Sequence, residues 1–97
     1  MSTKVICFKT SIGQDVIAAL VLQHSNGDLT VKRPYTINFA GFNPQTGEAE
    51  LQLLPFFLFN PDGDVLLKSN LIGSGIVDAP ISFEKNYLEQ STGLKLV

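Results

Sequence analysis

Reactive and cross-linking residues are scarce in this 97-residue chain, which has one cysteine, one histidine and no tryptophan. A lone cysteine excludes a disulfide framework and a metal site made of several cysteines. His24, the only histidine, stands beside a predicted hairpin turn, so the sequence offers it no partner for acid–base or nucleophilic catalysis. We therefore expect a protein that is not an enzyme and has no cofactor and no metal site.

Two short segments with chemically suggestive residues have simpler structural interpretations. NPDGD, residues 60–64, has the oxygen-rich start of a calcium-binding loop, but its twelfth position is Leu71 where such a loop needs a glutamate. We interpret it as a turn. Cys7, within the strand-like run KVICFK, is interpreted as a small buried hydrophobic residue.

Charge of either sign is also scarce, at 16% of residues against 44% hydrophobic ones, and the net charge is -2. No global positive field would gather nucleic acid, so any such binding needs a local patch. A small domain has a high surface-to-volume ratio, so this shortage of charge predicts some apolar surface in contact with another chain.

Long apolar runs and secretory features are absent as well. No run approaches the ~20 apolar residues of a membrane-spanning helix, and the N-terminal MSTKVICFK does not resemble a signal peptide. We expect one domain over residues 1–97, soluble and cytoplasmic, with no membrane partner.

The strands of this domain can be placed from hydrophobic patterns. Residues 16–22 are all apolar, which predicts a strand buried on both faces, and Asn26-Gly27 suits the hairpin turn that follows. Apolar and polar residues then alternate over 29–39, which predicts a long strand with one face, including Tyr35, in the core. Pro34 cannot donate to the ladder, so this strand is expected to bend there.

The second half of the chain predicts three more strands and one helix. The strands are residues 48–53, which continue into the apolar run LLPFFLF (53–59), then 65–67 and 71–77. The helix is expected at about 80–91, because Asp78 suits a cap, Pro80 the first turn and Gly93 the exit. Five main strands and a C-terminal helix make the fold mainly β.

The order of these segments resembles the Sm-like family. TSIGQDVIAALV (10–21) is similar to the first Sm motif, and VLLKSNLIGSGIVDAP (65–80) to the second, whose polar turn is either 68–70 or 73–75. More narrowly, VKRP, LLPFFLF and DAPISFEKNYLEQSTG, in that order, resemble the small Sm-like proteins of marine phages.

The resemblance implies a strongly bent, five-stranded Sm-like (SH3-like) barrel that closes into a homo-oligomeric ring, with a pentamer as the implied size. Strand 65–67 of one subunit would pair with strand 71–77 of the next, and Pro55 would mark a bend whose apolar outer face lies under the helix or the neighbouring subunit. The residues expected at the subunit interface are Phe56, Phe57, Phe59, Val65, Leu67 and Ile76.

Two functions follow from the resemblance. In the first, the ring binds single-stranded RNA at its pore and regulates phage or host RNA in the host cytoplasm, with contacts from Asn43, Gln45, Lys68, Ser69 and Asn70. In the second, the ring is an assembly or adaptor module without nucleic acid. The second is suggested because the arginine-glycine of the second Sm motif is missing. Asn43 and Asn70 also suit turns, and Lys68 suits a soluble strand edge.

Overall fold

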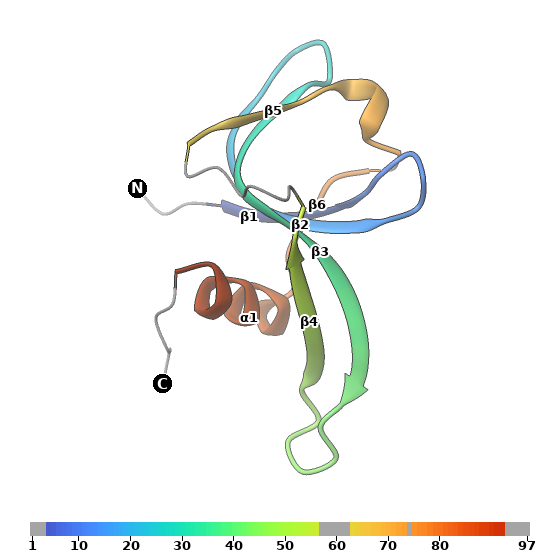
Figure 1. Cartoon of the computed structure of the whole chain (residues 1–97), viewed down its shortest axis with the longest axis vertical. Coiled ribbons are helices and arrows are strands. Elements are labelled where there is room, and N and C mark those ends of the chain that lie inside the picture. Colours follow the sequence, from blue (N-terminus) through green and yellow to red (C-terminus); the bar gives the residue numbers. More distant parts are fainter. Residues whose placement is uncertain (1–3, 57–62, 74, 93–97) are drawn as a thin grey trace.

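The computed structural model describes residues 4–56, 63–73 and 75–92. Six of the described segments form one antiparallel sheet, which curls into a barrel-like shape beside a single helix (Figure 1). The elements are β1 (Lys4–Lys9), β2 (Asp15–Gln23), β3 (Leu29–Phe42), β4 (Ala49–Pro55), β5 (Val65–Leu67), the 3₁₀ turn η1 (Ser69–Leu71), β6 (Val77–Asp78) and α1 (Ile81–Thr92).

Strand β3 is long enough to belong to two parts of the molecule. Its first residues, Leu29–Val31, pair with β5 and complete the barrel, whereas residues 35–42 pair with β4. The β3–β4 hairpin therefore extends away from the barrel as an arm, with α1 beside it (Figure 1). On the other side, β2 and β1 continue the sheet and β6 pairs with β1.

Each face of this sheet carries its own hydrophobic core. Neighbouring residues of β1 and β2 point alternately into the two cores, which explains the unbroken apolar run at 16–19. The helix core, under α1, consists of Val5, Ile17, Ala19, Tyr35, Leu51, Leu53, Ala79 and Tyr87. The barrel core consists of Ile6, Phe8, Val16, Ala18, Leu29, Val31 and Leu67.

A β-bulge at Arg33–Pro34 redirects β3 from one core to the other. At this point β3 has one more residue than its partner β2. Arg33 adopts a left-handed φ of 47°, and Pro34 brings no N–H to the ladder. The expected bend is present, but Val31 points into the barrel core and Tyr35 into the helix core. The expectation that one face of this strand meets a single core is therefore wrong.

The hydroxyl of Tyr87 bridges the strands where the bulge interrupts their ladder. It accepts a hydrogen bond from the Ala19 N–H at 3.1 Å and donates one to the Lys32 carbonyl at 3.0 Å. Burial raises the pKa of this hydroxyl, against a smaller lowering by the Arg33 charge, so it stays a donor at neutral pH. A residue of the helix thus connects β2 and β3 beside the bulge.

The mainly β, strongly bent fold with a C-terminal helix is confirmed, and the helix differs from its expected range by one residue at each end. Two details differ. β1 adds a strand to the expected five, and the expected strand 71–77 is instead a 3₁₀ turn, an isolated bridge from Ile72 to Thr10, and a short β6. Among the described residues, no helix has the length and apolar character needed to cross a bilayer.

Candidate functional site

The residues expected to bind RNA lie in two separate places. Asn43 and Gln45 belong to the turn between β3 and β4, at the end of the arm. Lys68, Ser69 and Asn70 lie in and before η1, on the barrel, near the opposite end of the molecule (Figure 1). The structure therefore does not bring the two groups together within one chain, and they do not form one binding site there.

Asn43 organises its own turn. Its Oδ1 accepts hydrogen bonds from the backbone N–H groups of Gln45, at 2.8 Å, and Thr46, at 3.3 Å. Its backbone N–H donates to the Glu48 carbonyl at 2.8 Å, and its carbonyl accepts from Gly47 at 2.7 Å. These are the bonds of an Asx turn, so the Asn43 side chain already has a structural role.

Ser69 and Lys68 are joined to Asp28, a buried carboxylate next to the β2–β3 turn. Asp28 accepts a hydrogen bond from the Ser69 N–H at 2.7 Å and one from the Asn26 amide at 3.2 Å. The Lys68 ammonium lies 3.8 Å from its second oxygen. The Ser69 N–H contributes most to holding the pKa of Asp28 below its ordinary value. Asp28 thereby fastens the hairpin to η1.

We expect replacement of Asp28 by asparagine to destabilise the fold at neutral pH and to have less effect in acid. The lowered pKa means that folding favours the carboxylate, so its contribution is present above the ordinary value near 4. This contribution is lost as the pH falls through the lower folded value. Denaturant unfolding of Asp28→Asn and of the unchanged protein, at pH 7 and at successively lower pH, measures the difference.

Asp64→Asn is the matched control, because the interaction of Asp64 found among the described residues is an exposed ion pair with Lys32 at 3.9 Å. Exposed pairs contribute little to stability. A stability difference for Asp28→Asn that stays constant from pH 7 into acid would contradict the assigned role.

The lysines of the described ranges do not form a basic strip. Four of them lie within reach of a carboxylate, so their charges are locally neutralised and phosphate would have to compete for them. The pairs, with their nitrogen–oxygen distances, are Lys4–Asp78 at 3.0 Å, Lys9–Asp15 at 3.7 Å, Lys32–Asp64 at 3.9 Å and Lys68–Asp28 at 3.8 Å.

One hollow among the described residues is apolar. It is a groove of about 450 Å³ between the start of α1, β6 and the sheet, with the Lys9–Asp15 ion pair at its rim. We call it the apolar groove; its main lining residues are Cys7, Ile37, Phe39, Val77, Pro80 and Phe83.

The groove continues into an exposed aromatic pair. Phe39 and Phe42 are 56% and 66% exposed, and their rings meet edge to face with centroids 5.1 Å apart. A register shift at Gly41, whose φ is 120°, places Phe42 beside Phe39. Val77, which also lines the groove, and Ile81, which follows the lining residue Pro80, are exposed too. Exposed apolar surface of this kind is typical of an interaction site.

Cys7 lines the groove as a half-buried, unreactive side chain. Burial raises the pKa of its thiol to about 11, with a further contribution from Asp15, so the thiolate is scarce at neutral pH. Among the described residues, no group of three or more histidine, cysteine, aspartate and glutamate side chains could hold a metal ion.

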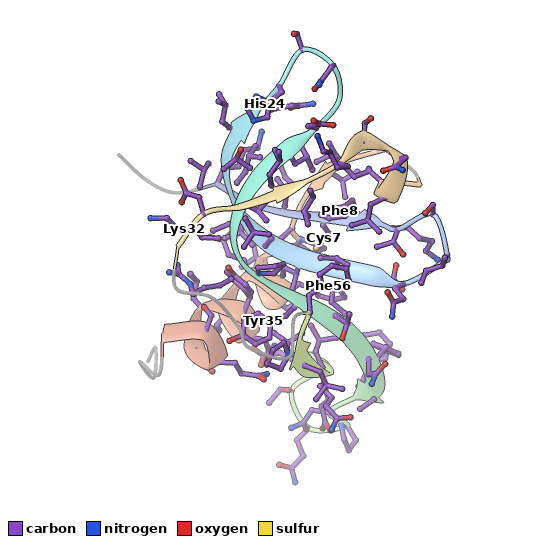
Figure 2. The ribbon with its side chains drawn as sticks, turned by 45° about the horizontal axis from the view of Figure 1, so that its top comes forward. Cys7, Phe8, His24, Lys32, Tyr35 and Phe56 are labelled. Atoms are coloured by element: carbon purple, nitrogen blue, oxygen red, sulfur yellow. The ribbon has the colours of Figure 1, made fainter. Side chains whose placement is uncertain are left out.

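A second apolar surface lies on the outside of the barrel. Leu22 and Leu66 flank Thr30 on neighbouring strands, and residues directly opposite each other in a ladder share a face. Leu22 is 54% and Leu66 50% exposed. His24 lies beside this surface with its Nε2 2.8 Å from the Thr30 hydroxyl, at the hairpin end of the molecule (Figure 2). We call Leu22, Thr30 and Leu66 the leucine ridge.

Of the described residues expected at the subunit interface, one belongs to the barrel core and three pack against it. Leu67 is only 2% exposed, so its side chain is already used within the chain. Phe56, Val65 and Ile76 pack against the same cluster while remaining partly exposed. Phe57 and Phe59 lie outside the described residues.

Several exposed apolar residues were not singled out from the sequence. Strict alternation predicts Phe39 in the core, and the apolar run 16–22 predicts Leu22 in a strand buried on both faces, yet both side chains are more than half exposed. Gly41, beside Phe42, is the sequence feature that indicates a break in this alternation, because an isolated glycine in a strand often marks a bulge.

Comparison with protein-family models, with curated proteins and with solved structures finds no match to this chain.

Proposed function

We propose that the protein works in the cytoplasm as a self-assembling module, forming a homo-oligomeric ring that serves assembly or adaptor functions without nucleic acid. The observation that supports this most is the apolar groove with its exposed aromatic pair, Phe39 and Phe42. Such a surface is costly to leave in water, and a chain with only 16% charged residues has few groups to shield it.

Covering this surface would favour association. Full burial of a phenylalanine side chain contributes roughly 1.5–3 kcal/mol, and Phe39 and Phe42 are both more than half exposed. Val77 and Ile81 would add to this. These contributions oppose the loss of translational and rotational freedom on binding, and a few residues of this kind at the centre of a contact carry most of its binding energy.

RNA binding at a ring pore is the competing proposal, and it has less support. Its expected contacts, Asn43 and Gln45 on one side and Lys68 to Asn70 on the other, are far apart in the chain's structure (Figure 1). The nearby lysine, Lys68, is paired with Asp28. Phosphate contacts need positive charge that is not already paired, and the lysine among these positions is paired with a carboxylate.

Self-assembly predicts a particle larger than the 10.6 kDa chain. Size-exclusion chromatography with light scattering, from low to high micromolar protein, is expected to give a single species of several subunits. A monomer over the whole range would contradict the proposal. In the same samples, short U-rich and A-rich RNA is expected not to bind at low salt; binding that weakens as salt rises would favour the RNA-binding ring instead.

A further inference from the structure

We propose that the apolar groove of one copy receives the leucine ridge of a second copy, so that subunits join head to tail. This inference rests on the proposed self-assembly and names the two surfaces that carry it. On the groove side, the exposed residues that would make the contact are Phe39, which lines the groove, and Phe42 beside it. On the ridge side they are Leu22 and Leu66.

The two surfaces lie on opposite sides of the helix contact along the same strands. Tyr87 of α1 meets β2 and β3 at Ala19 and Lys32. The groove lies beyond this point toward Ile37, and the ridge lies beyond it in the other direction, at Thr30. One subunit therefore presents two separate apolar surfaces, and a two-fold contact through either one would leave the other exposed to water. A head-to-tail contact covers both at once.

Shape favours the same pairing. The groove is a hollow, and two hollows facing each other across a two-fold axis would enclose empty space, which close-packed interfaces avoid. The ridge is on the outer side of the barrel, because its neighbour Leu67 points into the barrel core while Leu66 points out. Outward-pointing, half-exposed leucine side chains are the kind of surface that an apolar hollow of about 450 Å³ accepts.

The available area suits a specific contact. From their exposed fractions, the aromatic pair with Val77 and Ile81 on one side, and the two leucines on the other, offer roughly 700 Å² of apolar surface. Stable interfaces bury about 1,200–2,000 Å² in total, of which somewhat more than half is apolar. The pairing therefore reaches the lower end of this range.

The charges at the two surfaces also allow the contact. Lys9 and Asp15 stand at the rim of the groove, and Lys32 and Asp64 stand next to the ridge, each as an ion pair with side chains about half exposed. Each surface carries one lysine and one aspartate beside it, so the two surfaces do not repel each other through like charges. The lysine of either subunit can pair with the aspartate of the other.

Single substitutions test the two surfaces separately. Phe39→Asp damages the groove and Leu66→Asp the ridge, and both positions are exposed enough for the monomer to fold, which circular dichroism checks. Each is expected to weaken self-association about tenfold or more, measured by light scattering over a concentration series. Ile12→Asp is the matched control, since Ile12 is 77% exposed and belongs to neither surface; it is expected to assemble like the unchanged protein.

Mixing the two damaged variants gives the decisive result. Phe39→Asp keeps an intact ridge and Leu66→Asp an intact groove, so an equimolar mixture is expected to form a one-to-one dimer of twice 10.6 kDa and nothing larger. Should either variant lose its fold, Phe42→Asp and Leu22→Asp replace it in the same surfaces.

Each other outcome overturns the inference in a recognisable way. Loss of assembly with Phe39→Asp but not with Leu66→Asp, and no mixed dimer of the two variants, would mean a two-fold contact through the groove alone; self-assembly would then stand as a dimer and not as a ring. Unchanged assembly in both variants would place the contact elsewhere and leave the proposed ring standing. A monomeric unchanged protein removes the proposed function itself.

Discussion

Replacement of Tyr87 by phenylalanine is expected to lower the free energy of unfolding by about 2–4 kcal/mol. The substitution keeps the ring, its full burial and its edge-to-face contact with Tyr35. It removes one oxygen that serves two buried backbone groups, the Ala19 N–H and the Lys32 carbonyl. Both groups lie beside the bulge, where the β2–β3 register shifts, so the substitution removes a hydrogen-bond partner from each of them in the buried core.

Thermal or denaturant unfolding measures this loss, which corresponds to a fall in Tm of about 10 °C or more for a domain of this size. Tyr35→Phe is the matched control. Tyr35 is the other buried tyrosine and lies 5.9 Å from Tyr87 between ring centroids, but no hydrogen bond of its hydroxyl is found among the described residues. A similar loss in both variants would show that ring polarity, and not the bridge across the bulge, is responsible.

Alkaline pH provides a second test of the same bridge. The pKa of Tyr87 is raised by burial above its ordinary value near 10, so the folded protein holds this proton longer than the unfolded chain. Stability from this group is constant below pH ~10 and falls as the pH rises from there through the folded pKa. The difference in stability between the unchanged protein and Tyr87→Phe is therefore expected to shrink above pH ~10; a constant difference would contradict the assignment.

The sequence carried enough information for the elements of the fold but not for the faces of its strands. The Asn26-Gly27 hairpin, the helix after Pro80 and the bend at Pro34 follow from local chemistry, which sequence patterns record well. Which core each residue enters depends on a one-residue bulge, because an added residue reverses the alternation beyond it. Arg33 takes up the left-handed conformation at this bulge, and its residue type gives no sign of it.

The candidate site was less predictable for a related reason. The resemblance implies RNA contacts on two loops that face a ring pore, and within one chain β3 carries the turn with Asn43 away from the barrel as an arm (Figure 1). The length of β3 decides this separation. Likewise, Phe39 and Phe42 become one exposed pair only through the irregularity at Gly41. Exposure is a property of the assembled sheet, so the alternation of apolar and polar residues alone predicts Phe39 in the core.

A methyl group at Gly73 is expected to cost about 3 kcal/mol or more of unfolding free energy. Gly73 follows η1 and its N–H donates to the Lys9 carbonyl at 2.7 Å, which brings this segment against β1. An added Cβ would lie 2.5 Å from the Thr10 carbonyl oxygen and 2.9 Å from the Ser11 Cα. These are backbone atoms, so relief requires the segment to move away from β1, and the hydrogen bond that closes this side of the barrel would be broken.

Gly75→Ala isolates this effect, because an added Cβ at Gly75 meets nothing within 4 Å and the residue belongs to the same short glycine-containing segment. It is expected to change stability by no more than about 0.5 kcal/mol. Denaturant unfolding of the two variants side by side makes the comparison. Equal effects would mean that backbone freedom in the segment matters more than close approach to β1. A large effect of Gly73→Ala alone would show that barrel closure, and with it the position of Val77 at the groove, depends on the absence of one side chain.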